Sequence, residues 1–183
     1  QVQAMNHMFF EFRYFAKTPT PNLTSLDLNA LIKEIMGLYE GSAIQVDLVS
    51  DCPRVMGDPT QLRQVIHNLL QNAQDASLET GHLEGAIAIK TELVPINDIG
   101  QSKFAVRMTI TDSGPGFQAK ILARAFEPYI TTKVKGTGLG LAVVKKIIDD
   151  HGAKIEINNR KQGDAVLGAQ VSILFVNLAK EAA

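Results

Sequence analysis

The chain has 183 residues, of which 45% are hydrophobic and 20% are charged, and its formal net charge is −1. This balance is typical of a globular protein, and it lacks the basic excess that a nucleic-acid-binding domain carries, so we expect no nucleic-acid partner. The single cysteine, Cys52, excludes an intramolecular disulfide framework and a cysteine-rich zinc site, and it fits a reducing compartment. No apolar run approaches the ~20 residues that cross a bilayer.

The start of the chain reads as the end of a helix followed by a linker. Apolar residues recur at spacings of three and four through residues 1–16, which predicts a short amphipathic helix. Pro19 and Pro21 then interrupt any helix. Because the chain opens at Gln1 without an initiator Met or a signal peptide, we expect it to be part of a longer protein. We therefore expect a helical end and linker over residues 1–21 and one globular domain over residues 22–183.

The rest of the chain alternates helical and strand patterns without a strict βαβ order, which favours an α+β fold with one mixed sheet and helices on one face, a two-layer sandwich. The best-marked helix starts at Asp58, a capping carboxylate followed by Pro59, and its apolar spacing runs to about Ser77. The other expected helices cover residues 27–39, 119–124 and 139–151, and the expected strands cover 44–49, 86–94, 104–111, 155–157 and 171–176, with a loop at 95–102.

Polar side chains form a stripe along the helix that begins after Asp58. Asn68, Asn72 and Asp75 fall at i, i+4 and i+7, beside the apolar stripe of the same helix. A solvated helix face explains such a stripe as well as a binding site does. Asn is, however, a poor residue for a helix interior, and an amide oxygen is a ligand that Mg²⁺ accepts together with water and phosphates.

Two glycine-rich segments follow. Asp112 comes directly after a strand and leads into Gly114 and Gly116, so its carboxylate could accept from the amino group of a purine, although the same residues also suit a plain turn. The second segment, Gly136-Thr137-Gly138-Leu139-Gly140-Leu141, opens a helix, whose free N–H groups favour phosphate. It lacks the Lys and Ser/Thr of a P-loop and the βαβ setting of a dinucleotide fingerprint.

Taken in order, four motifs resemble the ATP-binding (Bergerat-fold) domain of sensor histidine kinases, gyrase, the Hsp90 chaperone and MutL. Residues 68–73 resemble the N box of the kinases and residues 112–117 their first Gly box, while 126–133 resemble the F box and 136–141 the second Gly box. The Thr131-Thr132-Lys133 ending of the F box is most similar to nitrogen-regulation sensor kinases. Residues 1–21 likewise resemble the end of the second dimerisation helix of such kinases.

The resemblance implies ATP and Mg²⁺ as cofactors and a role for each motif. Asn72 would be the Mg²⁺ ligand, with Asn68 and Asp75 beside it, and Asp112 would read adenine. The phosphates would contact residues 136–141, Thr131, Thr132 and Lys133. Because residues 125–138 contain few apolar anchors, we also expect them to form a lid that becomes ordered with nucleotide. The resemblance further implies transfer of the γ-phosphoryl group to a His outside this chain and then to a response regulator, in a homodimeric parent whose membrane anchor lies elsewhere, with this domain cytoplasmic.

Three comparisons with the family pattern refine this interpretation. The ATPase branches carry a catalytic Glu where this chain has Asn68, which disfavours fast hydrolysis. The phosphoacceptor motif is absent, and the context of His7 does not match it. At Gly168-Ala169 the chain has Ala where many relatives carry Thr, so no phosphate contact is assigned there. The alternatives are a nucleotide-sensing module without kinase activity and an ATPase of the gyrase or Hsp90 type.

Overall fold

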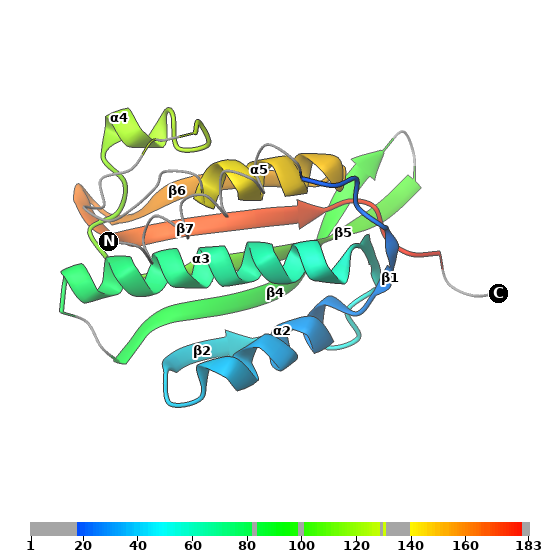
Figure 1. Ribbon diagram of the computed structural model, residues 1–183, viewed down its shortest axis with the longest axis horizontal. Helices are drawn as coiled ribbons and strands as arrows, with labels where there is room; N and C mark the ends of the chain where they lie inside the picture. The colour runs from blue at the N-terminus through cyan, green and yellow to red at the C-terminus, as the bar shows by residue number, and fades with distance from the viewer. Residues whose placement is uncertain (1–17, 82–83, 99–100, 129, 131–139, 181–183) are drawn as a thin grey trace.

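The computed structural model describes residues 18–81, 84–98, 101–128, 130 and 140–180 (Figure 1). The helix expected over residues 1–16 lies outside these ranges. In chain order the elements are β1 (Thr24–Leu26), α2 (Leu28–Met36), the 3-10 helix η1 (Gly37–Tyr39), β2 (Ala43–Asp47), β3 (Val55–Gly57), α3 (Pro59–Glu79), β4 (Glu84–Asp98), β5 (Gln101–Thr111), α4 (Ala119–Leu122), α5 (Gly140–Asp150), β6 (Lys154–Gln162) and β7 (Ala165–Phe175).

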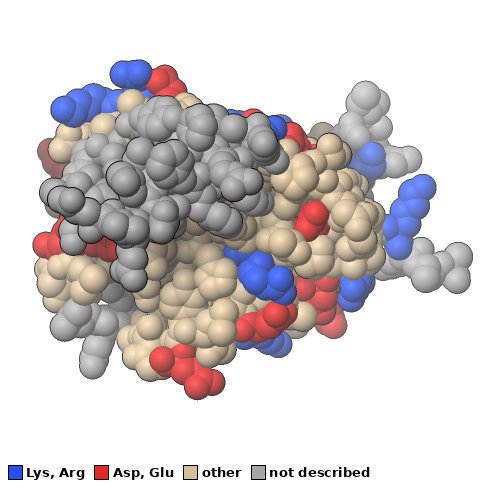
Figure 2. Space-filling view, in the orientation of Figure 1, with Lys and Arg blue, Asp and Glu red and all other residues tan. Residues whose placement is uncertain are grey.

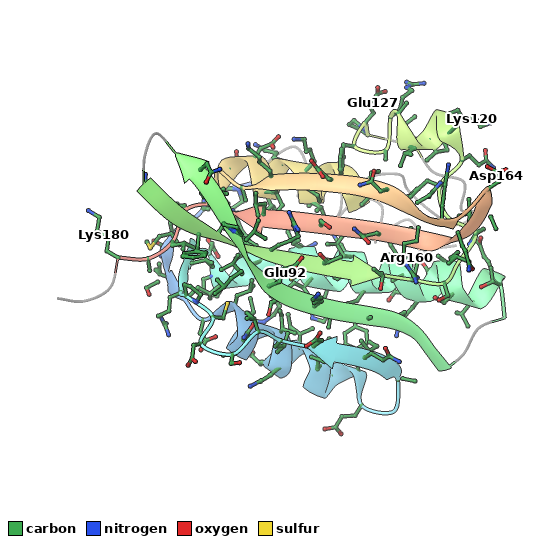
Figure 3. All side chains as sticks on the ribbon, turned by 180° about the vertical axis from the view of Figure 1, so that it is seen from behind. Glu92, Lys120, Glu127, Arg160, Asp164 and Lys180 are labelled. Carbon is green, nitrogen blue, oxygen red and sulfur yellow. The ribbon has the colours of Figure 1, made fainter. Side chains whose placement is uncertain are left out.

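The sheet has five strands in the order β2-β4-β5-β7-β6, in which β2 and β4 run parallel and the other neighbours antiparallel. Helices α2, α3 and α5 cover one face (Figure 1), and the view from behind shows the other face without helices (Figure 3). This arrangement confirms the predicted two-layer α+β sandwich. A separate antiparallel pair, β1 and β3, was not predicted, because three-residue strands are too short to show a periodic pattern.

The core lies between the sheet and the three helices. Helix α3 begins where the sequence predicts, since the Asp58 side chain accepts from the N–H groups of Thr60 and Gln61. Its apolar stripe is fully buried, and α3 packs beside α5. The buried side chains of these two helices include Leu62, Val65, Ile66, Leu69, Leu70, Val144, Ile147 and Ile148. This packing fixes the polar stripe of α3 along one side of the helix layer.

The loop expected at residues 95–102 is instead the outer part of a long hairpin. β4 and β5 stay paired to Asp98 and Gln101, with Pro95 opposite Phe104. β2 pairs with β4 only as far as Lys90, so β4 is an edge strand at Pro95, where a missing N–H donor is tolerated.

The last two strands are also longer than the apolar pattern predicts. β6 and β7 together form a second hairpin. In its outer part every side chain of β6 is polar (Asn158–Gln162), and every residue of β7 is apolar or glycine (Ala165–Ala169). Neither stretch alternates apolar and polar side chains, so the pattern that predicts a strand ends at the inner part of each strand.

Charged side chains of both signs are intermixed on the coloured surface in Figure 2, in keeping with the net charge of −1. Within the described ranges, no helix combines the length and the apolar character needed to cross a bilayer.

Candidate functional site

The polar stripe of α3 forms one wall of the candidate site. Asn68, Asn72 and Asp75 are all half-buried, in line with a position at the border between the packed and the exposed sides of the helix. The Gln71 amide donates to Asp75 Oδ1 at 3.0 Å. The stripe therefore presents amide and carboxylate oxygens next to the core, as the spacing predicts.

Asp112 lies at the end of β5 and is only 7% exposed. Its Oδ1 accepts from two backbone N–H groups, those of Gly114 at 2.9 Å and Ala169 at 3.0 Å. In the described part of the chain, no donor contacts Oδ2. One oxygen therefore holds the carboxylate in place, while the other keeps its capacity to accept a hydrogen bond from a ligand.

The loop after Asp112 packs directly against the C-terminal part of α3. A Cβ added at Gly114 would lie 2.6 Å from the Cβ of Ala76, so only glycine permits this approach. The Thr80 hydroxyl donates to the Ser113 carbonyl at 2.9 Å. Because Asn72 precedes Ala76 by one helical turn, it lies on the same side of α3 as this contact. The structure thus brings the first two predicted motifs together.

β7 completes the surroundings of Asp112, a role that the sequence analysis did not assign. Besides the Ala169 N–H donated to Oδ1, the Asp112 N–H donates to the Ala169 carbonyl at 3.0 Å. A Cβ at Gly168 would collide with the Asp112 carbonyl, and Gly168 has a φ of +147°, which favours glycine. The glycine itself was visible in the sequence, but its partner lies more than fifty residues earlier in the chain.

The F-box residues that the structure describes serve as an anchor. Phe126 is half-buried against the core, and Lys145 Nζ lies 5.9 Å from its ring centroid. Glu127 is exposed and accepts from Arg124 at 2.7 Å; this hydrogen bond lowers the pKa of Glu127. Gly140 and Leu141 open α5. The predicted lid, apart from residues 125–128 and 130, lies outside the described ranges, and so do the other predicted contacts: Thr131, Thr132, Lys133, Gly136, Thr137, Gly138 and Leu139.

The open face of the sheet offers a second candidate site. A hollow of 710 Å³ lies over the open face of the sheet, but its two cationic residues, Lys90 and Arg107, both pair with Glu92, at 3.5 and 3.2 Å. Over residues 18–180, apart from the undescribed gaps, no three His, Cys, Asp or Glu side chains form a group that could hold a metal.

Residues 57–179 match the family model described as "Histidine kinase-, DNA gyrase B-, and HSP90-like ATPase". An NtrY-like sensor histidine kinase of Rickettsia bellii (strain RML369-C) is 33% identical over 174 residues, which cover 89% of this chain and 26% of that protein. The nitrogen regulation protein NtrY of Azorhizobium caulinodans is 33% identical over 175 residues, covering 89% and 21%. The chain thus spans about a quarter of the length of these curated relatives.

Solved structures agree with this match. The nucleotide-free catalytic domain of histidine kinase ThkA is 30% identical, with a TM-score of 0.66 and coverage of 85% of this chain and 96% of that one. ThkA in complex with the response regulator TrrA is 26% identical, with a TM-score of 0.71 and coverage of 96% and 49%. The four motifs, the two-layer fold and a family match over most of the chain all agree. The chain belongs to the family of histidine kinase-, DNA gyrase B- and HSP90-like ATPases.

Proposed function

We propose that this chain is the ATP-binding catalytic domain of a sensor histidine kinase, which passes the γ-phosphoryl group of ATP to a His outside this chain. The observation that carries the proposal is the geometry of Asp112. One of its carboxylate oxygens is held by two backbone N–H groups, no donor among the described residues contacts the other, and the loop after Asp112 packs against α3 at Ala76. A buried carboxylate with one free oxygen suits the exocyclic amino group of adenine.

The residues of this chain would act by binding and orienting the nucleotide. Asp112 Oδ2 would accept from the adenine amino group, and the Asn72 side-chain oxygen would hold Mg²⁺. When bound, Mg²⁺ would neutralise charge on the phosphate oxygens. The N–H groups of the second Gly box, at the start of α5, would contact the same phosphates. Site residues and cofactor roles follow from the motif resemblance, and the fold supports them by joining Asp112 to α3.

The position of Asn68 favours phosphoryl transfer over hydrolysis. An amide cannot take a proton from an attacking water, so this position supplies no general base. In the proposed step, the bond between the γ-phosphorus and its bridging oxygen breaks, and a phosphorus–nitrogen bond to the acceptor His forms, with ADP as the leaving group. The acceptor would lie on the dimerisation helices of a homodimeric, membrane-anchored parent, and the relay would end on a response regulator, the kind of partner that ThkA has in its complex.

A transfer assay tests the proposal. The purified chain is mixed with a separately prepared dimerisation and phosphoacceptor domain of the parent and with γ-labelled ATP. We expect label on the acceptor and little free phosphate. Release of free phosphate alone would indicate an ATPase of the gyrase or Hsp90 type, and binding without either product would indicate a nucleotide-sensing module. The Asp112→Ala variant serves as the control, because it should lose ATP binding and all labelling together.

A further inference from the structure

Two consecutive side chains of β6 reach the loop after β5 from opposite faces of the sheet. Successive residues of a strand point to opposite sides, so Asn159 lies on the helix-covered face with Ile155, while Arg160 lies on the open face with Asn158. Both bond to main-chain groups of the segment 112–117. This segment contains the predicted adenine-reading carboxylate.

Asn159 holds the C-terminal end of the segment, at Phe117, through both the oxygen and the nitrogen of its side-chain amide. The Phe117 N–H donates to Asn159 Oδ1 at 2.7 Å, and Asn159 Nδ2 donates to the Phe117 carbonyl at 2.8 Å. The amide thereby replaces the backbone partner that a neighbouring strand would supply. Gly116, with a φ of +74°, makes room for it, since a Cβ there would lie 2.8 Å from Asn159 Oδ1.

Arg160 holds the near end of the segment. Its Nη1 donates to the main-chain carbonyl of Asp112 at 2.6 Å. Arg160 is paired in register with Gly168 on β7, the strand between β6 and β5, and the absence of a side chain at Gly168 lets the guanidinium cross that strand. Figure 3 labels Arg160 beside the end of β5. Each end of the segment is thus fixed by a different residue of β6.

We propose that Asn159 and Arg160 are positioning residues that hold the Asp112 carboxylate in the orientation needed to select adenine; this inference rests on the proposed function. The segment 112–117 contains two glycines, so without these bonds it has more conformations to lose when a base binds. A segment that is already ordered binds more tightly, because the ordering entropy is not lost again on binding. The gain applies to the hydrogen bond from the adenine amino group to Asp112, which needs the carboxylate in one orientation, and not to the phosphates, which this segment is not proposed to contact.

The test compares two nucleotides that differ only at the base. Purine riboside triphosphate has a hydrogen where ATP has the amino group, so the ratio of the two dissociation constants reports the contact with Asp112. Calorimetry with Mg²⁺ on the whole chain should show that wild type prefers ATP. In Asn159→Ala and in Arg160→Ala we expect ATP to bind about tenfold more weakly, the effect of one poorly made buried hydrogen bond, while the analogue changes by less than about twofold.

Two further variants sharpen the comparison. Arg160→Lys keeps one donor and should recover part of the ATP preference, because only a single bond to the Asp112 carbonyl is needed. Asn158→Ala, on the open face and exposed, should behave as wild type. The affinity of each variant for the analogue also reports whether the variant is folded.

Three outcomes would overturn the inference. If ATP affinity is unchanged in both variants, the β6 bonds do not position the carboxylate. If ATP and the analogue lose affinity equally, Asn159 and Arg160 support the fold alone. If wild type itself fails to prefer ATP, the assignment of Asp112 fails, and the proposed function loses its main support together with the inference. The first two outcomes leave ATP binding by the wild-type chain intact, so they are distinguishable from a failure of the proposed function.

Discussion

The two carboxylate oxygens of Asp112 differ in their surroundings: backbone N–H groups hold one, and the other is proposed to contact the ligand. Oδ1 accepts from the N–H groups of Gly114 and Ala169, one from its own loop and one from β7. This arrangement removes the rotational freedom that the side chain would otherwise lose on binding a base. The chemistry at the ligand is therefore set by the group in the Oδ2 position alone.

Asp112→Asn should weaken the preference of the site for ATP over GTP. The two backbone N–H groups require an oxygen at the Oδ1 position, so the amide NH₂ of Asn must occupy the Oδ2 position and donate where Asp accepts. Wild type should bind ATP more tightly than GTP, whose carbonyl would face the carboxylate, by about tenfold or more. In Asp112→Asn the dissociation constant for GTP divided by that for ATP should fall below the wild-type value. An unchanged ratio, measured by competition with a fluorescent nucleotide, would remove Asp112 from base recognition.

His67, next to Asn68 on α3, has surroundings that favour its neutral form. The Tyr39 hydroxyl lies 3.1 Å from His67 Nδ1, and the two rings are 5.8 Å apart. Burial, and secondarily the positive charge of Arg63, lowers the pKa of His67 below its ordinary value. The unfolded chain, with an ordinary imidazole pKa of about 6.5, therefore binds a proton before the folded chain does as the pH falls.

This difference predicts a pH dependence of stability. Because the unfolded state binds more protons just below pH ~6.5, the free energy of unfolding contributed by His67 is complete above that pH and is lost as the pH falls toward the lower, folded pKa. His67→Gln should remove this part of the pH dependence. Urea denaturation at pH 7.5 and pH 5.5 measures it: wild type should lose more stability between the two pH values than the variant. Equal losses would show that His67 does not contribute.

Helix α3 packs against the core with one side and carries the proposed metal ligand Asn72 at the border of that side. Its apolar residues are buried against the sheet and α5, while Asn72 is half-buried at the edge of that packing. A change at Asn72 should therefore affect a ligand more than the fold. The same helix ends against Gly114, so it also carries the support for Asp112.

Asn72→Ala should abolish the part of ATP affinity that depends on Mg²⁺, because the variant lacks the proposed oxygen ligand. The melting temperature should stay close to that of wild type. Titration of ATP with Mg²⁺ and with EDTA measures the effect, and Gln74→Ala, also half-buried on α3, is the matched control. If Asn72→Ala retains the wild-type difference between the two titrations, the metal is held elsewhere.

Distant parts of the chain meet at the start of α3. His151, 3% exposed at the end of α5, accepts from the Asp58 N–H through Nε2 at 3.0 Å, and its Nδ1 faces the Ile147 carbonyl at 2.8 Å. The Asp58 carboxylate also accepts from the Asn22 N–H at 2.9 Å. The helix cap of α3, the end of α5 and the segment entering the domain therefore share one set of hydrogen bonds.

His151→Ala should destabilise the folded chain by about 2 kcal/mol or more, because it removes the acceptor of the Asp58 N–H and leaves a cavity under α5. The melting temperature should fall by several degrees, while the ratio of ATP to GTP affinity in the folded protein stays at the wild-type value. Differential scanning calorimetry measures the change, with Lys154→Ala, exposed and close in sequence, as control. A variant as stable as wild type would show that this junction contributes nothing.

The features that the sequence determined are those that depend on near neighbours. Asp58 and Pro59 mark the start of α3, the apolar spacing gives its buried face, and the order of the motifs indicates the family. The contacts that arrange the site join residues far apart: Ala169 is 57 positions from Asp112, Asn159 is 42 from Phe117, and His151 is 93 from Asp58. The first two exist because β7 lies between β5 and β6, and the third because α5 packs beside α3, arrangements that no local pattern encodes. The polar outer part of β6 has no apolar alternation, so its bonds to the segment 112–117 became visible only when the strands were paired.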